Sequence, residues 1–456
     1  MLPLTVRKIA EVTGGSFVGS AEILDAEITS VVRDNRECVA GSLFLCFVGE
    51  RADGHDYANA AFDAGAVCAI AERGLADAKG AYIVVDSTAK ALQTLGAYYR
   101  NLLTIPVIGV VGSVGKTTMK ELIAAALGAK FNVWKTPENL NNEIGVPLTL
   151  LGTGAEHTAA VVEMGISAFG EMTRLAETAR PDYVVFTAVG HCHLDNLINL
   201  DGVLRAKAEV FPLMKSGGVA ILCGDDEKLR NFDPKIRKIT FGAEPHNDYR
   251  AENIVTDGTE GVSFALVTPE SRVPVSIRAY GSHLAPSAAG AAAVAELLGV
   301  PAEEIARGLA SYRTIAGRAN VIRTESLTII DDCYNANPNS VAASLRSLAE
   351  LSGRRVAILG DMNELGRNSN ELHRDTGILA GKLGIDVLIC CGEKAEFIFK
   401  GFIASKSEKK SYHFPFRDAM FERLPGLIKK GDAILVKASH SMQFEEVVTR
   451  VRNLRP

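Results

Sequence analysis

The stretch "PVIGVVGSVGKTTMKELIAAALGAK", residues 106–130, constrains the fold more than any other part of the chain. An apolar run of strand length leads into a glycine-containing turn, and a helical pattern follows the turn directly. Such a strand is apolar on both faces, which is typical of a parallel sheet that is covered by helices. The stretch therefore predicts an α/β fold with this turn at the carboxyl edge of a sheet.

Compact apolar runs that end at or near a glycine recur along the chain. "TAAVVEMG", "DYVVFTAVG" and "GVAILCG" follow the first run, and residues 243–281 alternate with turns in a way that predicts antiparallel strands. "LTIIDD", "RRVAILGDM", "DVLICCG" and "DAILVKAS" are four further strand candidates. We therefore expect three α/β domains: a small N-terminal domain (1–83), a central parallel-sheet domain with the glycine turn (84–312) and a Rossmann-like C-terminal domain (313–456).

The bulk composition excludes some classes of protein. The 456 residues are 47% hydrophobic and 23% charged, with a net charge of -5 and no basic stripe, which disfavours a nucleic-acid partner. Eight cysteines lack any C-x-x-C spacing and fit a reducing compartment. There is no signal-peptide pattern, and no apolar run approaches the ~20 residues that span a bilayer. We expect a cytoplasmic monomer without membrane insertion.

The turn "GSVGKTT" has the chemistry of a phosphate-binding loop. Gly112 and Gly115 let the backbone N–H groups approach phosphate oxygens. Lys116 supplies a positive charge for the outer phosphates, and Thr117 supplies a hydroxyl for Mg²⁺. The helix that follows directs its positive N-terminus at the same anion. The expected nucleotide-binding residues of the loop are Gly112, Ser113, Val114, Gly115, Lys116, Thr117 and Thr118.

A plain glycine turn at a strand–helix junction is the alternative interpretation. The common form of the loop has glycine five residues before Gly115, where this chain has Val110, with the glycine at Gly109 instead. Because Lys116 and Thr117 are present in the expected order, we favour a nucleotide-binding loop.

Other candidates for chemistry follow the next strands. Glu163 ends the run "AAVVE", where a carboxylate would lie near Mg²⁺, although it could equally cap the following helix. His191 and His193 have no partner at zinc-ligand spacing, and a lone loop histidine is more often solvated. Lys207 lies in the helical "LRAKAEVF", so its simplest interpretation is a solvated face. The asparagine-rich "TPENLNNEIGVPLTLL" favours turns over a polar binding surface.

These motifs together resemble the Mur ligases, ATP-dependent amide-bond-forming enzymes of peptidoglycan synthesis, and most closely the MurF type that adds D-Ala-D-Ala. The resemblance covers essentially the whole chain. It rests on "DNRECVAGSLFLCFVGERADGHDY", "GSVGKTTMKE", "TPENLNNEIGVPLTLL", "VVEMG", "DDCYNANPNSVAASL" and "LGDMNELG". The family's glycine spacing also accounts for Gly109 and Val110.

The resemblance implies a ligase that joins D-Ala-D-Ala to UDP-MurNAc-tripeptide through an acyl phosphate. The N-terminal domain would hold the UDP end of the substrate through Asp34, Arg36, Gly49, Asp53, Gly54 and His55. Arg318, Asp332 and Asn335 would bring the third domain over ATP. Thr117, Glu163, His193 and Lys207 would be Mg²⁺ ligands, with Lys207 as a carbamate. Lys116, Asn139, Asn142, Glu163, His193 and Lys207 would be catalytic, so residues 139–143 would face substrate rather than serve only as turns.

Several positions depart from the family pattern. The first-domain signature usually reads Asp-Ser-Arg, and this chain has Asn35 in the middle. Leu284 and Ser287 stand where asparagines are usual, and the second of those commonly helps to hold adenine. Ala438 and His440 stand where glycine and arginine are usual. None of these positions belongs to the phosphate loop or the expected metal ligands, so we expect activity to survive.

Two alternatives to this function remain open from the residues. One is another amide ligase of the same family, such as the enzyme that adds the third residue, or folylpolyglutamate synthase; the third-residue enzyme usually carries Asp-Asn-Pro-Arg, which this chain lacks. The other is a switch or motor ATPase, which would need an Asp-based second motif and no uridine-binding domain.

Overall fold

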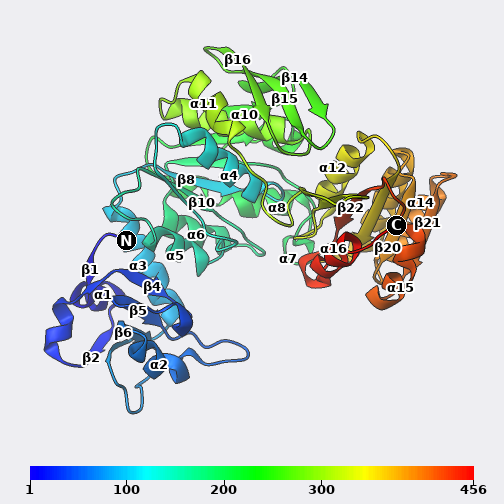
Figure 1. Cartoon of the computed structure of the whole chain (residues 1–456). Coiled ribbons are helices and arrows are strands. Elements are labelled where there is room, and N and C mark those ends of the chain that lie inside the picture. Colours follow the sequence, from blue (N-terminus) through cyan, green and yellow to red (C-terminus); the bar gives the residue numbers. More distant parts are fainter.

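The computed structural model describes all 456 residues and arranges them in three lobes, each built on its own sheet (Figure 1). The N-terminal lobe hangs below a central lobe, and the C-terminal lobe lies to one side of the central one. This confirms the predicted class, three α/β domains with the glycine turn in the middle one. None of the helices is both long enough and apolar enough to cross a bilayer.

The N-terminal lobe is a five-stranded sheet with the order β2-β7-β6-β5-β4. Its elements are β1 (Leu4–Thr5), α1 (Val6–Thr13), β2 (Ser16–Val18), β3 (Glu27–Ile28), β4 (Ser30–Val32), β5 (Ser42–Leu45), α2 (Ala58–Asp63), β6 (Ala66–Ala71) and β7 (Ala81–Val84). β1 and β3 form a separate antiparallel pair. The strands β5, β6 and β7 lie in the apolar runs of the sequence, whereas β1 to β4 are too short to have been predicted.

The central lobe contains a nine-stranded sheet with the order β16-β15-β14-β13-β12-β11-β8-β10-β9. Its strands are β8 (Val107–Val111), β9 (Val133–Lys135), β10 (Ala159–Glu163), β11 (Tyr183–Phe186), β12 (Val219–Cys223), β13 (Arg237–Gly242), β14 (Tyr249–Asp257), β15 (Gly261–Val267) and β16 (Arg272–Ile277). Along the sheet from β9 to β14, each pair of neighbouring strands is parallel. β15 is antiparallel to β14, and β16 is antiparallel to β15, as the alternation of residues 243–281 predicts.

Helices cover both faces of this sheet. They are α3 (Thr88–Leu102), α4 (Lys116–Leu127), α5 (Gly145–Leu151), α6 (Glu171–Ala179), α7 (Leu194–Leu197), α8 (Leu200–Ala208), α9 (Glu227–Asn231), α10 (Leu284–Leu297) and α11 (Ala302–Ala310). Successive residues of a strand point to opposite faces, so Ile108 and Val110 pack with α4, α10 and α11, while Val107 and Val111 pack with α3, α5 and α6. The second core continues through α3 into the N-terminal lobe.

The C-terminal lobe is a six-stranded sheet with the order β17-β18-β22-β19-β20-β21, in which only β17 is antiparallel. Its elements are β17 (Asn320–Arg323), β18 (Thr328–Asp331), α12 (Pro338–Ala349), β19 (Arg355–Gly360), α13 (Ser369–Lys382), β20 (Val387–Cys391), α14 (Ala395–Ala404), β21 (Lys410–Phe414), α15 (Arg417–Leu427), β22 (Ala433–Lys437) and α16 (Glu445–Arg452). The four predicted strands are present. The edge strands β17 and β21 are additions, because their residues are partly exposed and carry no apolar run.

The eight cysteines are all free thiols, and seven of them are buried. This agrees with the expectation that they act as small apolar residues rather than as a disulfide framework.

Candidate active site

The phosphate loop joins β8 to α4 at the carboxyl edge of the central sheet. Gly112 has φ +146°, and a Cβ there would lie 2.0 Å from Thr187 Oγ1, so only glycine fits. Gly115, at φ +78°, is the N-cap of α4, which begins at Lys116. The Lys116 ammonium donates to the Gly112 carbonyl at 2.9 Å, so the lysine lies across its own loop. The N-terminus of α4 thus faces any anion held by the loop.

Glu163 lies beside this loop at the end of β10 and is 2% exposed. Its Oε2 accepts from Thr117 Oγ1 at 3.0 Å, and its Oε1 accepts from Asn141 Nδ2 at 2.9 Å. The alternative that Glu163 caps a helix is wrong, because α6 begins at Glu171 and has Gly170 as its N-cap. The carboxylate instead faces the phosphate loop.

In the asparagine-rich stretch, some side chains stabilise the turn and others face the site. Asn141 contacts Glu163, and a Cβ at Gly165 would come within 2.9 Å of the Asn141 side chain, so the glycine makes room for it. Asn142 accepts from Gly145 N at 2.9 Å and so stabilises the start of α5. Asn139 lines a cavity next to the loop. Asn141 is therefore the asparagine of this stretch that contacts Glu163, and the catalytic roles expected of Asn139 and Asn142 stay predictions.

His193 lines a cavity beside the phosphate loop, and Lys207 lies on α8. Lys207 is 1% exposed and its amine has no hydrogen bond or ion pair, so the prediction of a solvated face is wrong. Burial lowers the pKa of Lys207 to about 8. Burial also lowers the pKa of His193, whose Nδ1 lies against a carboxylate oxygen of Glu364 from the C-terminal lobe.

The C-terminal lobe closes one side of the loop. Arg318 stacks on Tyr334, with its guanidinium carbon 3.9 Å from the ring centroid, and donates to Thr117 Oγ1 at 3.4 Å. Asp332 forms an ion pair of 2.7 Å with Lys437, and both side chains are mostly buried. Lys437 also donates to the Asn335 carbonyl at 3.0 Å. The three expected third-domain residues are thus brought to the phosphate loop, with Tyr334 and Lys437 as additional members.

A polar cavity of about 300 Å³ lies between these elements. It is lined by the loop residues Ser113 to Thr117 together with Asn141, Glu163, His193, Arg318 and the start of α12. Asn337 and Ser340 form a capping box there, so the N-termini of α4 and α12 both face the cavity. Two helix dipoles and two cationic side chains therefore favour a polyanion such as a nucleoside triphosphate.

A smaller cavity of about 100 Å³ also adjoins the loop and shares Val114, Gly115 and Thr117 with the first. Tyr280 and His283 line it, and the Tyr280 hydroxyl and His283 Nδ1 are buried without a hydrogen-bond partner. Ser287 also lines this cavity, but its hydroxyl donates to the His283 carbonyl at 3.0 Å. Unpartnered buried polar atoms next to a phosphate site are what a heterocyclic base could satisfy.

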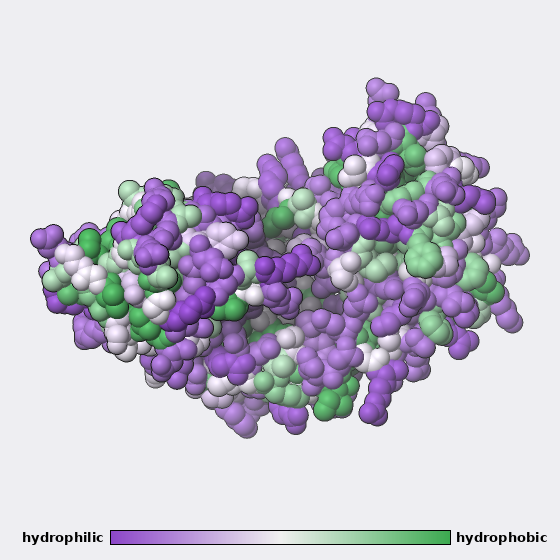
Figure 2. Space-filling view, turned by 90° about the horizontal axis from the view of Figure 1, so that it is seen from below, coloured by the Kyte–Doolittle hydropathy of each residue, from purple (hydrophilic) through white to green (hydrophobic).

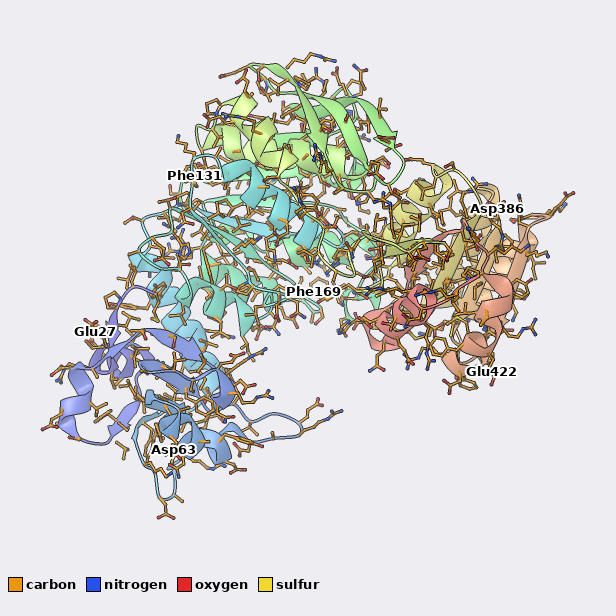
Figure 3. All side chains as sticks on the ribbon, viewed as in Figure 1. Glu27, Asp63, Phe131, Phe169, Asp386 and Glu422 are labelled. Carbon is orange, nitrogen blue, oxygen red and sulfur yellow. The ribbon has the colours of Figure 1, made fainter.

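The expected substrate residues of the N-terminal lobe are not brought to this cavity. Figure 2 shows a hollow between the N-terminal and C-terminal lobes. In Figure 3, Glu27 and Asp63 are labelled on the N-terminal lobe, and Asp386 and Glu422 on the C-terminal lobe. Phe169 marks the nearby margin of the central lobe in Figure 3.

Within that lobe the expected residues pair with one another. Asp34 and Arg36 form an exposed ion pair of 2.5 Å, which holds the pKa of Asp34 at about 2. Asp53 contacts His55 at 2.5 Å and Arg73 at 2.6 Å. Gly54 packs against the backbone of residues 46–47, where a Cβ would not fit, and Gly49 joins the same loop.

The donor set at the phosphate loop suits Mg²⁺ better than zinc. No three His, Cys, Asp or Glu side chains converge at metal-binding distance. Mg²⁺ is commonly held by one or two protein oxygens plus waters and phosphate oxygens. The oxygens of Thr117 and Glu163 are 3.0 Å apart, which matches the ~3 Å between adjacent oxygens around an octahedral ion with 2.0–2.1 Å bonds.

Comparison with known proteins identifies relatives along the full length. Three family models match: "Mur ligase family, catalytic domain" over residues 27–100, "Mur ligase middle domain" over 110–295 and "Mur ligase, glutamate ligase domain" over 317–440. UDP-N-acetylmuramoyl-tripeptide--D-alanyl-D-alanine ligases of Bacillus subtilis (strain 168) and Escherichia coli (strain K12) are 35% and 34% identical, each with 98% of both chains covered.

Solved structures give the same result. A crystal structure of MurF from Acinetobacter baumannii superposes with a TM-score of 0.90 at 31% identity, covering 99% of both chains. MurF ligase from Thermotoga maritima in complex with ADP has a TM-score of 0.82 at 30% identity, covering 93% of this chain and 97% of that one. Folylpolyglutamate synthase of Mycobacterium tuberculosis shares the fold, with a TM-score of 0.60 at 14% identity.

Proposed function

The chain belongs to the Mur ligase family, and from this we infer that it joins D-Ala-D-Ala to UDP-MurNAc-tripeptide at the expense of ATP, a step of peptidoglycan precursor synthesis. The observation that carries this inference is the end-to-end match to ligases of that name, which covers 98% of this chain. It is an ATP-dependent ligase rather than a switch, since the whole three-lobed architecture is that of the solved MurF enzymes.

ATP would occupy the two cavities that adjoin the phosphate loop. Its phosphates would lie in the 300 Å³ cavity, against Lys116 and the N-termini of α4 and α12. Its base would enter the smaller cavity, where Tyr280 and His283 offer unpartnered polar atoms in place of the usual asparagines. Arg318, fixed by stacking on Tyr334, would reach the outer phosphates.

Thr117 and Glu163 would hold Mg²⁺, with His193 and a carbamate on Lys207 towards a second ion. Mg²⁺ would supply neutralisation of charge on the phosphoryl oxygens. The Lys207 amine suits carbamate formation because it is buried, unpaired and has a lowered pKa, so a neutral amine is available to attack CO₂ with release of one proton. The product is an anion where the free lysine would repel a cation.

The reaction follows from the weakness of a carboxylate as an acyl donor. The tripeptide carboxylate takes the γ-phosphoryl group of ATP, which gives an acyl phosphate and ADP. The amine of D-Ala-D-Ala then attacks the acyl carbon, phosphate leaves, and the amine loses a proton. Lys116 and the two helix N-termini stabilise charge in the first step, and Asn141 fixes the orientation of the Glu163 carboxylate.

The three lobes would divide the substrates. Residues 1–83 would bind the UDP end through the loops of Asp34 and Asp53, residues 84–312 would bind ATP, and residues 313–456 would cover the nucleotide and receive the dipeptide. Closure over the hollow between the lobes would exclude water that hydrolyses an acyl phosphate. Eight free thiols support a cytoplasmic site of action, and we propose a monomer.

An isotope transfer experiment tests the proposed chemistry. The tripeptide carboxylate is labelled with ¹⁸O, and the released phosphate is analysed by mass spectrometry. An acyl phosphate passes one carboxylate oxygen to the phosphate, so one ¹⁸O per phosphate is expected. Unlabelled phosphate would show that ATP hydrolysis is not coupled to carboxylate activation, as in a switch ATPase.

The choice of amine separates this enzyme from the third-residue ligase of the same family. The chain lacks the Asp-Asn-Pro-Arg sequence of that enzyme. Offering D-Ala-D-Ala with the tripeptide, and a single amino acid with the corresponding dipeptide, should give product only in the first case. Product only in the second case would keep the family and change the reaction.

A further inference from the structure

Lys120 is a buried lysine that the reaction does not use. It lies on the second turn of α4 and its side chain is among the largest fully buried ones, with 1% of the residue exposed. Its ammonium donates to the Thr136 carbonyl at 2.8 Å and to the Glu138 carbonyl at 3.4 Å. The nearest carboxylate is that of Glu121 at 3.5 Å. A buried ammonium aimed at two carbonyls of one turn holds that turn in place.

The turn is the connection between β9 and α5, and its conformation costs free energy. Glu138 has φ +45°, the left-handed region that non-glycine residues rarely adopt. Conformations of this kind persist where the surrounding structure holds them. The Lys120 ammonium bonds the carbonyl of Glu138 itself and that of Thr136 just before it, so it acts on the strained part of the turn.

Two hydrogen bonds join this turn to Glu163. The Thr136 hydroxyl accepts from the backbone N of Glu163 at 2.9 Å. Asn141, at the end of the turn, donates to the Glu163 carboxylate at 2.9 Å and accepts from the backbone N of Gly165 at 2.8 Å. The position of the Glu163 carboxylate relative to the phosphate loop is therefore set by the turn that Lys120 holds.

We propose that Lys120 is a positioning residue that, by holding the turn of residues 136–141, fixes the Glu163 carboxylate and Asn141 beside the phosphate loop. Its ammonium bonds carbonyls of the turn, and it acts from the second turn of the same helix that carries Lys116 and Thr117. Helix α4, which begins at the phosphate loop, thus also determines the position of the Glu163 carboxylate beside that loop. The predicted effect of Lys120 on Mg²⁺ and ATP rests on the proposed function, whereas the contacts that hold the turn do not depend on it.

Lys120→Met tests the proposal, with Lys135→Met as the matched control. Methionine keeps the length and apolar contacts of the lysine stem but donates no hydrogen bond. Lys135 lies on β9 and pairs with the same Glu121, yet it makes no bond to the turn. Hydrogen exchange of peptides spanning residues 134–143 and 160–166, measured by mass spectrometry on the full chain without ligands, reports the turn directly.

In Lys120→Met we expect exchange in both peptides to rise about tenfold or more, and in Lys135→Met to change less than about twofold. Affinity for ADP is measured with and without Mg²⁺. Lys120→Met should bind ADP alone as tightly as wild type does. The increase in ADP affinity that Mg²⁺ causes should be about 10-fold or more smaller than in wild type, because residues that orient a metal ligand typically contribute this much to metal affinity. Lys120→Arg, which keeps a donor, should recover part of both effects.

Unchanged exchange in Lys120→Met would overturn the proposal, as would raised exchange that leaves the Mg²⁺ gain intact. Equal effects in Lys120→Met and Lys135→Met would assign them to Glu121 and also overturn it. If Lys120→Met fails to fold, Thr136→Val removes the link to Glu163 N from the other end and must reduce the Mg²⁺ gain. Failure of the chain to ligate D-Ala-D-Ala would refute the proposed function but leave the exchange result to decide the role of Lys120.

Discussion

The central cavity and the N-terminal lobe treat their charged residues in opposite ways. Around the phosphate loop, Lys207 is buried without a partner, Lys116 has only a carbonyl of its own loop, and Glu163 is held by neutral donors. In the N-terminal lobe, Asp34 pairs with Arg36, and Asp53 pairs with His55 and Arg73.

This difference indicates what each region does with its ligand. Buried charges without ionic partners cost free energy, so we expect ligands that supply those partners to stabilise the central cavity. Exposed ion pairs such as that of Arg36 with Asp34 contribute little to stability and open readily, so this loop loses little when a substrate replaces a partner. Substitutions should therefore affect catalysis and stability strongly in the first region and substrate affinity alone in the second.

Lys116→Ala should have the largest effect. The charge that faces the outer phosphates is lost, and the expected fall in kcat/KM is about 10³-fold, comparable to loss of one preorganised electrostatic group at other active sites. Steady-state phosphate release measures it. Lys90→Ala, an exposed lysine on α3, is the control and should be unchanged. Full activity of Lys116→Ala would sink the assignment of the phosphate loop.

Lys207→Met should lower activity about 10- to 100-fold, because methionine cannot form the carbamate. In wild type the neutral amine is needed, and its pKa of about 8 means that the neutral fraction grows as the pH rises through 8. After CO₂ is removed, resupplying the same concentration of dissolved CO₂ at each pH should therefore restore activity faster at pH 9 than at pH 7. A pH-independent recovery would contradict a free Lys207 amine as the acceptor.

The same substitution should stabilise the ligand-free protein. Below pH 8 Lys207 is charged in both folded and unfolded chains, and the lowering of its pKa from 10.5 to about 8 costs the fold about 3 kcal/mol. This cost disappears as the pH rises from 8 to 10.5. In CO₂-free buffer, denaturant unfolding at pH 7 should show Lys207→Met more stable than wild type, with the gap closing towards pH 10.5. A less stable variant at pH 7 would contradict the unpaired buried amine.

Arg36→Ala should raise the KM for the UDP-linked peptide about tenfold with little change in kcat or in Tm, since the side chain is 84% exposed. Arg7→Ala breaks a similar exposed pair, with Asp25, in the same lobe and serves as the control. Equal effects of the two variants would remove any special role of the Asp34 loop in substrate binding.

Tyr334→Leu should have the smallest effect. It removes the ring on which Arg318 stacks, and we expect the KM for ATP to rise about fivefold, in the range of one cation–π contact. Phe397→Leu removes the ring beneath Lys400 in the same lobe and should leave the KM for ATP unchanged. A lowered kcat with unchanged KM would mean that Tyr334 acts on the chemical step instead.

The backbone of the site could be predicted from sequence because local pattern determines it. A buried strand, a glycine turn and a helix place Gly112 to Thr118 and Glu163 at one edge of a parallel sheet, whatever else the chain does. The long apolar runs of the central and C-terminal sheets could also be predicted as strands. In contrast, β2, β17 and β21 are short or partly exposed, and they form strands because neighbouring strands pair with them.

The side chains that tertiary packing buries could not be predicted in this way. Lys207 and Lys120 have the composition of solvated helix faces, and only the neighbouring strands and turns make them buried. Which asparagine of residues 139–142 meets Glu163 depends on the path of a turn with a left-handed residue, which spacing does not reveal. The resemblance to Mur ligases indicated the stretch, and the structure singled out Asn141 within it.

The most direct test of the proposed function is phosphate release from Mg-ATP with UDP-MurNAc-tripeptide in the presence and absence of D-Ala-D-Ala, followed by the mass of the product. We predict sustained release only when both substrates are present, and a UDP-linked product heavier by the dipeptide less one water. Release that is indifferent to either substrate, or a nucleotide-linked peptide of unchanged mass, would contradict the proposed ligase.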